Sequence, residues 1–306
     1  MPEDFVLRPR AVLRAEGWNN RRLRTAVADG ELVRPVHGFY GSGVLPTGSK
    51  RHLARARAIA QRLGTSAVLS HHTAALVHGL PLEFDDPDDV HLTVAPPARG
   101  GRRSGYHMHV APLPAEDVVE VDGLRVTSLA RTAADLARVV PYEWGVAAMD
   151  VVLRRGITRD AVQAVCDASK RRAGVETLRA VIGFAHEGAR SAAESISRVT
   201  MARAGVPAPV LQYEVTNESG WLATTDFAWP EFNVIGEVDG DAKVDEAVER
   251  GQKASTLVRY QQDRDEFIRR AGWWPTHWGW KVACDPHLLG ERIRAAFAAG
   301  RGLRRG

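Results

Sequence analysis

The chain has 306 residues, of which 44% are hydrophobic and 25% are charged, the composition of a soluble globular protein long enough for two or three domains. It has no apolar run long enough to cross a membrane and no signal peptide, and its two cysteines, Cys166 and Cys284, exclude a disulfide framework. We therefore expect a cytoplasmic protein.

The net charge of +4 is unevenly distributed along the chain. Residues 1–60 hold eleven Arg and Lys against five Asp and Glu, a local excess of +6 that leaves the remainder near −2. A basic N-terminal segment is typical of proteins that bind nucleic acid. Because arginine is abundant in all proteins from GC-rich genomes, the charge alone does not establish DNA binding.

Residues 1–48 predict a short helix, a second helix and a hairpin. Asn19 or Asn20 can cap the second helix, and Gly30 ends it. This order of elements predicts a winged helix-turn-helix, whose second helix offers side chains to the major groove of DNA. The alternative is a small structural subdomain with a solvated basic face. The candidate nucleic-acid-binding residues are Arg21, Arg22, Arg24 and Thr25.

Residues 49–140 predict a middle α+β domain. Its segments include an amphipathic helix (KRHLARARAIAQRLG), a second helix (SHHTAALVHGLPL) and two alternating strands (DVHLTVAP and YHMHVAPL). His107 and His109 would share one strand face, as two zinc ligands can. Since no acid or cysteine has a supporting spacing, we expect these two, and also His71, His72 and His78, to be core or surface histidines, with a metal site as the alternative.

Several segments of this half resemble one family, the AbiEi-type antitoxins of type IV toxin–antitoxin systems. They are the basic helix with the hairpin end HGFYGSG, then SHHTAALVHGLPL and VDGLRVTSLARTAADLA. The resemblance covers about the first half of the chain. It implies a DNA-binding N-terminus, with autoregulation or toxin neutralisation and a toxin protein as a partner. It supplies no catalytic residues.

Beyond a predicted helical connector at 141–188, residues 189–306 predict a third domain with acids on its strands. Asp226 lies between apolar strand neighbours, and alternation places Glu237 and Asp239 on one face of the next strand. Converging carboxylates repel each other unless a cation intervenes, and oxygen ligands suit Mg²⁺. The sequence therefore predicts a metal site at these three acids, with a solvated strand end as the alternative.

This spacing resembles the PD-(D/E)xK nuclease core, and in particular the very-short-patch-repair-like endonucleases, from about Ala189 to His287. The resemblance implies hydrolysis of phosphodiester bonds with Mg²⁺ or Mn²⁺. Asp239 stands at the position of the motif lysine, so that Lys243, four residues on, could take over its work. The implied catalytic residues are Glu194 on a helix, Asp226 as the bridging acid, Glu237 as the second ligand, Asp239 and Lys243.

The polar segment after these strands carries basic side chains that could approach a phosphate backbone or simply lie in solvent. They are Lys243, Lys253, Arg259, Arg264, Arg269 and Arg270. The next segment concentrates four tryptophans, for which core packing is the main interpretation, and His277 between them could assist proton transfer.

The sequence thus predicts a multidomain α+β protein with a winged helix-turn-helix, a middle α+β domain and a C-terminal restriction-endonuclease-like α/β domain. Two functions stay open. One is a DNA-binding protein with a metal-dependent endonuclease domain. The other is a non-catalytic antitoxin or transcriptional regulator that binds DNA and a toxin and keeps an inactive nuclease fold. The set of acids favours the enzyme, and the missing lysine favours the regulator.

Overall fold

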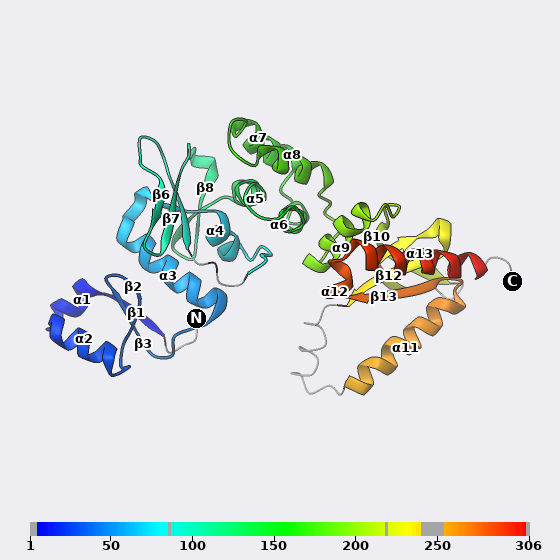
Figure 1. The fold of residues 1–306 in the computed structure, drawn as a ribbon, viewed down its shortest axis with the longest axis horizontal. Coiled ribbons are helices and arrows are strands. Elements are labelled where there is room, and N and C mark those ends of the chain that lie inside the picture. The colour runs from blue at the N-terminus through cyan, green and yellow to red at the C-terminus, as the bar shows by residue number, and fades with distance from the viewer. Residues whose placement is uncertain (1–4, 85–86, 88, 218–219, 240–253, 304–306) are drawn as a thin grey trace. The chain divides into compact units, whose positions relative to one another are not determined.

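The structure is a computed structural model, and it describes residues 5–84, 87, 89–217, 220–239 and 254–303 (Figure 1). The chain forms two compact units, the N-terminal unit (residues 1–141 and 156–182) and the C-terminal unit (residues 142–155 and 183–306). Helices and sheets occur in both, which confirms a multidomain α+β protein. The predicted connector at 141–188 contributes helices to both units. No helix in the described part of the chain has the length and apolar character that a membrane crossing needs.

The N-terminal unit begins with a three-stranded sheet in the order β1-β3-β2 and two short helices. These elements are β1 (Val6–Pro9), α1 (Arg10–Ala15), α2 (Asn20–Ala28), β2 (Val33–Val36) and β3 (Phe39–Ser42). The side chain of Asn19 caps α2 by accepting a hydrogen bond from the backbone N–H of Arg22 (2.9 Å). Leu23 and Ala26 form the buried face of α2. The two helices and the hairpin follow in the predicted order, whereas β1, which pairs with β3, was not predicted. The assignment as a winged helix-turn-helix stays a prediction.

A six-stranded mixed sheet in the order β6-β7-β5-β4-β9-β8 follows in the same unit. Its elements and helices are α3 (Gly48–Leu63), β4 (Val68–Leu69), α4 (His71–His78), β5 (Val90–Val94), β6 (Gly101–Arg103), β7 (Tyr106–Val110), β8 (Val118–Val121), β9 (Leu124–Thr127) and α5 (Leu129–Ala137). Strands β5 and β7 run parallel, with His91 opposite His107 and Thr93 opposite His109. Apolar side chains of α3, α4 and the sheet form one core, which fixes the strands that carry these histidines.

A buried group of charges anchors α5. Arg131 donates from Nε to Asp135 Oδ2 (2.7 Å) and from Nη1 to Asp117 Oδ2 (2.7 Å), and Arg138 Nη2 lies 3.2 Å from Asp135 Oδ1. Burial by itself would lower the pKa of Arg131, but the two carboxylates outweigh it and raise that pKa. Helix α7 (Arg159–Ala168) packs against α5, and α8 (Val175–Phe184) follows it.

The C-terminal unit is built on a four-stranded sheet in the order β10-β11-β12-β13. Strands β10 to β12 are antiparallel neighbours, and β13 pairs in parallel with β12 after the chain returns through α11. The elements are α6 (Tyr142–Arg154), α9 (Ala192–Arg203), β10 (Val210–Asn217), β11 (Gly220–Trp229), β12 (Val234–Asp239), α11 (Ala254–Arg270), β13 (Trp274–Gly279), α12 (Trp280–Ala283) and α13 (Pro286–Leu303).

The two faces of this sheet carry different cores. Val238 and Trp278 pack with side chains of α9 and α13, whereas Ile235 packs with Ile268 of α11. Since successive residues of a strand point to opposite faces, Glu237 lies on the α11 side of β12. The tryptophan cluster is therefore core at Trp278, as the sequence favoured.

Candidate functional site

Helix α2 presents the predicted nucleic-acid-binding residues to solvent. Arg21, Arg22, Arg24 and Thr25 are all exposed, whereas Leu23 and Ala26 of the same helix are buried. The guanidinium of Arg22 lies over the ring of Trp18, 3.9 Å from its centroid. Such a contact orders a long side chain without removing it from solvent. The helix therefore offers four polar side chains on one outward surface.

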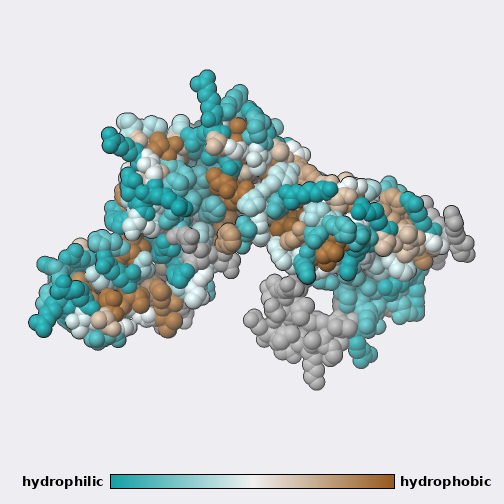
Figure 2. Space-filling model, in the orientation of Figure 1, coloured by the Kyte–Doolittle hydropathy of each residue, from teal (hydrophilic) through white to brown (hydrophobic). Residues whose placement is uncertain are grey.

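A hollow of about 210 Å³ lies where α1 and α2 meet the β2–β3 hairpin. It is lined by Arg10, Asn20, Arg24, Arg34, His37, Gly38 and Tyr40, among which there is no acid. Arg10 Nη2 donates to Asn20 Oδ1 (2.7 Å), which holds one guanidinium at its rim. In Figure 2 the part of the chain that contains α1, α2 and the hairpin lies at the lower left, and its outer surface is mostly hydrophilic beside a smaller apolar area. A hollow with three arginines suits a phosphate group.

In the C-terminal unit the predicted acids lie on adjacent strands. In the antiparallel pair of β11 and β12, Phe227 lies opposite Gly236. The same register, continued by one residue, places Asp226 opposite Glu237. There the carboxylate of Asp226 accepts a hydrogen bond from the backbone N–H of Val238 (Oδ2 to N, 3.1 Å). Across β12 and β13, Glu237 lies opposite His277. The structure therefore places acids of β11 and β12 beside a histidine of β13.

Glu237 is buried and already has a cationic partner. Its Oε2 forms an ion pair with Arg264 of α11, which also donates from Nη2 to the backbone oxygen of Thr224 (3.0 Å). Its Oε1 is buried and has no hydrogen-bond partner among the described residues. An unsatisfied buried carboxylate oxygen is costly, about 1–3 kcal/mol or more. One carboxylate oxygen of Glu237 is thus paired with a guanidinium, and the other has no hydrogen-bond partner among the described residues.

His277 connects this group of acids to α11. Its Nε2 lies 3.0 Å from Asp265 Oδ1, and its Nδ1 lies 3.8 Å from Glu237 Oε2 and 3.9 Å from Asp239 Oδ2. The sequence had singled out His277 but not Asp265, and Arg264 only as a basic side chain of a polar stretch. No local signal could pair Arg264 with Glu237, because they lie 27 residues apart in the chain.

Glu194 has a structural environment of its own. It is buried on α9, where its Oε2 accepts hydrogen bonds from the backbone N–H of Arg190 and from Gln212 Nε2, both at 2.9 Å. The Ser191 side chain caps the same helix by accepting from the Glu194 N–H (3.2 Å). Glu194 therefore ties the start of α9 to β10. The predicted Lys243 lies outside the described residues.

Among the described residues, one group of three His, Cys, Asp or Glu side chains has its ligand atoms within 4.8 Å of one another, and it is in the N-terminal unit. It consists of His71, His91 and His109. Within the same described ranges, the three predicted acids of the C-terminal unit form no such group. The sequence pattern had paired His107 with His109, and it gave no sign that His91 belongs to the same group.

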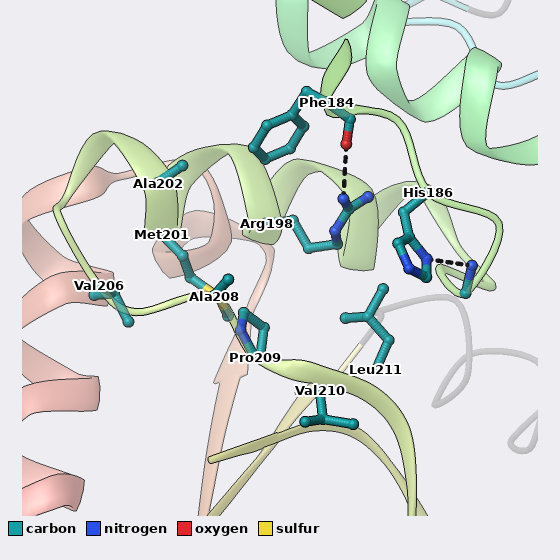
Figure 3. Close-up of a pocket in the computed structure, with 11 residues that line it drawn as sticks. Phe184, His186, Arg198, Met201, Ala202, Val206, Ala208, Pro209, Val210 and Leu211 are labelled. Carbon is teal, nitrogen blue, oxygen red and sulfur yellow. Dashed lines mark hydrogen bonds between the residues drawn. The ribbon is translucent and has the colours of Figure 1, made fainter. Parts of the chain in front are cut away.

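The C-terminal unit also contains a hollow of about 390 Å³ that none of the predicted site residues lines (Figure 3). Arg198 lies at its wall and donates to Asp150 Oδ2 (2.8 Å) and to the backbone oxygen of Phe184 (2.9 Å). Burial raises the pKa of Asp150, and the charge of Arg198 opposes that shift. Because Arg198 is committed to these two acceptors, the hollow offers mainly apolar contacts, from Met201, Val206 and their neighbours.

Comparisons with known proteins bear on the N-terminal unit most directly. The AbiEi antitoxin C-terminal domain family matches residues 66–182, which confirms the antitoxin resemblance for that segment. Two Mycobacterium tuberculosis proteins, uncharacterized protein MT2308 (strain CDC 1551 / Oshkosh) and uncharacterized protein Rv2248 (strain ATCC 25618 / H37Rv), are each 29% identical over 221 residues, which is 72% of this chain and 78% of theirs. The crystal structure of RV2827C protein from Mycobacterium tuberculosis is 15% identical, with a TM-score of 0.40, and covers 59% of this chain and 77% of that chain. The resemblance of residues 189–306 to nucleases stays a prediction.

Proposed function

We propose that this chain is a DNA-binding protein of the toxin–antitoxin class, which grips a DNA duplex with a winged helix-turn-helix at its N-terminus. The observation that carries the proposal is the outward surface of α2, where Arg21, Arg22, Arg24 and Thr25 are all exposed beside a hollow lined by arginines. The antitoxin family match at residues 66–182 supports the same class.

The contacts divide into two kinds. Side chains of α2 reach base edges in the major groove, where a guanidinium can bind guanine with two hydrogen bonds. The hollow between α2 and the hairpin, with Arg10, Arg24 and Arg34, receives a backbone phosphate and fixes the orientation of the helix. Because phosphate contacts release counterions from DNA, binding should weaken steeply as salt rises.

The second partner in this proposal is a toxin protein, bound by the segment that matches the antitoxin family. The match names an antitoxin domain, and its residues 66–182 include all six strands of the six-stranded sheet with α4, α5 and α7. Binding of the promoter by the antitoxin then regulates the pair. Co-purification of untagged candidate toxins with the full chain tests this part separately from DNA binding.

DNA binding is tested by fluorescence anisotropy of a labelled duplex from upstream of the protein's own reading frame, at several salt concentrations. We expect Arg21→Ala/Arg22→Ala/Arg24→Ala to bind at least about 10-fold more weakly, and its salt slope to fall by about 0.9 for each phosphate that the variant no longer neutralises. The matched control removes three exposed arginines elsewhere in the unit, Arg99→Ala/Arg103→Ala/Arg171→Ala. If the control loses affinity and the α2 variant does not, the proposed interface is wrong.

A second candidate function is metal-dependent cleavage of DNA by the C-terminal unit. The succession of α9, three antiparallel strands, α11 and a parallel fourth strand supports it, because this is the order expected of a PD-(D/E)xK core. The unsatisfied Oε1 of Glu237 fits a hard divalent cation, which takes oxygen ligands and keeps several waters. Asp226, Glu237 and Asp239 would hold Mg²⁺ or Mn²⁺, which would polarise a phosphate oxygen and lower the pKa of bound water.

The chain's own residues have defined tasks in this second function. Arg264 neutralises one oxygen of Glu237, which lowers the net negative charge that an approaching phosphodiester meets. His277, oriented by Asp265, can accept or release a proton beside Glu237. Glu194 connects the start of α9 to β10 through its hydrogen bonds. Lys243 is the proposed source of a further positive charge.

Nicking of supercoiled plasmid in Mg²⁺, Mn²⁺ or EDTA tests this candidate. Asp226→Asn and Glu237→Gln should abolish any metal-dependent cutting while DNA affinity is kept, and the exposed Glu231→Gln serves as the control. DNA binding without cutting in either metal would leave the regulator as the function and the C-terminal unit as a scaffold.

A further inference from the structure

Histidines from three elements of the N-terminal unit meet at one place. His71 is the first residue of α4, His91 lies in β5, and His109 lies in the neighbouring strand β7. They are separated by 20 and 18 residues, so the fold and not the local sequence brings them together. His71 is buried, and the other two are partly buried.

The ligand atoms of these three side chains face one another. His91 Nδ1 lies 3.0 Å from His109 Nε2, and the ring of His71 stacks on that of His109 with centroids 3.8 Å apart. All three ligand nitrogens lie within 4.8 Å of one another. Two nitrogens bound to one tetrahedral Zn²⁺ at 2.0–2.1 Å are about 3.3 Å apart, which is close to the 3.0 Å between the His91 and His109 nitrogens.

We propose that His71, His91 and His109 bind one divalent transition-metal ion, for which Zn²⁺ is the reference. Three imidazoles around an open position suit such ions and not Mg²⁺, which prefers oxygen. The open fourth position would take water or a ligand atom from a bound molecule, as in zinc sites with three protein ligands. None of these three histidines is among the residues proposed to bind DNA or among the acids of the C-terminal unit.

Neighbouring side chains hold His71 in the orientation that the site needs. His71 Nδ1 lies 2.9 Å from Ser70 Oγ, and Ser70 Oγ accepts a hydrogen bond from Thr93 Oγ1 (2.8 Å). In the metal-bound form we expect His71 Nδ1 to donate to Ser70, which leaves the lone pair of Nε2 for the ion. The backbone of His71 has a φ of 49°, an unfavourable value for a residue with a side chain. Strain of this kind persists where the surrounding structure fixes a functional side chain.

The imidazoles of this group are neutral. Burial first, and then neighbouring histidines, lower the pKa of His91 to about 2, and burial first, and then His107 and Arg138, lower that of His109 to about 4. Burial also lowers the pKa of His71 well below its usual value. Of the two arginines that act on this group, Arg138 is paired with a carboxylate, whereas Arg172 adds positive charge. Neutral imidazole is the form that binds metal.

A purely structural cluster would leave a polar group unsatisfied. His72 Nδ1 is buried and has no hydrogen-bond partner among the described residues, and its ring lies 4.9 Å from that of His91. A protein core normally satisfies such atoms. An ion with its bound water would place a further hydrogen-bonding group inside the cluster.

The test uses the full chain after removal of any affinity tag and treatment with EDTA. Zn²⁺ binding is measured by isothermal titration calorimetry, and Co²⁺ binding by visible absorption, whose intensity distinguishes tetrahedral from octahedral coordination. We expect one ion per chain, tetrahedral Co²⁺, and a higher melting temperature with Zn²⁺.

The variants His91→Gln and His109→Gln keep polarity and most of the side-chain volume, so they should fold, which circular dichroism checks. Each should weaken Zn²⁺ binding by more than the roughly 100-fold that loss of an outer hydrogen-bond partner can cost. His287→Gln is the matched control on an exposed histidine of the C-terminal unit. Absence of stoichiometric Zn²⁺ binding, or equal binding by the three variants and the natural protein, would overturn the proposal. Octahedral Co²⁺ that is insensitive to these substitutions would do so as well.

Discussion

The two units each gather titratable side chains beside a sheet, but they balance the charge in opposite ways. In the C-terminal unit the buried carboxylate of Glu237 already has a guanidinium partner, Arg264. In the N-terminal unit three neutral imidazoles face one another. A buried charged group with an internal counter-ion has less need of an external ion. A cluster of neutral imidazoles, in contrast, offers nitrogen ligands to a metal ion. The more promising metal site is therefore not where the acidic motif led us to expect one.

The largest expected effect of a single substitution concerns the buried charges of α5, of which Arg138 acts on His71 and His109. Asp135 is the carboxylate between Arg131 and Arg138, and all three side chains are buried. Asp135→Ala would remove the carboxylate that pairs with both guanidiniums, so we expect a loss of about 3–5 kcal/mol in the free energy of unfolding. Urea denaturation measures this, with the exposed Asp167→Ala as the control. A loss of unfolding free energy below about 1 kcal/mol would show that the N-terminal unit tolerates Arg131 and Arg138 without Asp135. The contrast drawn between the two units would then be wrong.

The next effect tests the internal cation of the C-terminal unit. Arg264→Ala leaves Glu237 buried without its partner, and because Arg264 is partly exposed we expect a loss near the lower end of the range for buried pairs, about 3 kcal/mol. The exposed pair of Arg270 and Glu266 gives the control, Arg270→Ala, with an expected loss of at most about 1 kcal/mol.

The same variant sharpens the metal question. If Mg²⁺ and Arg264 compete for Glu237, Mg²⁺ should raise the melting temperature of Arg264→Ala more than that of the natural protein. Addition of Glu237→Gln should remove that difference. An equal response of both proteins to Mg²⁺ would argue against a cation site at Glu237.

A further test of the comparison is the pH dependence of the metal-free N-terminal unit. The folded-state pKa values of His91 and His109, about 2 and about 4, lie below the unfolded value of 6.5. The unfolded chain therefore binds more protons than the folded one below pH 6.5, and stability is lost as pH falls from 6.5 towards 4. Urea midpoints in EDTA at several pH values measure this loss. We expect a shallower dependence for His91→Gln/His109→Gln, and an unchanged one would mean that other groups control acid unfolding.

The sequence predicted local features of the fold well. Short-range rules predicted a cap at Asn19 or Asn20 and opposite orientations for Glu237 and Val238, and in the structure Asn19 is the cap and Val238 packs on the face opposite to Glu237. The order of strands in the six-stranded sheet and the pairing of β12 with β13 depended on contacts far apart in the chain. No periodicity in the sequence reports those contacts.

The candidate sites divide in the same way. By itself the sequence determined which residues could act: a basic helix, acids on adjacent strands, and a middle segment rich in histidine. Only the tertiary structure decided that Arg264 neutralises Glu237, that Glu194 tethers α9 to β10, and that His91 joins His71 and His109. The physical reason is that a side chain's charge state and ligand geometry depend on what the fold buries beside it, and these neighbours come from distant segments of the chain.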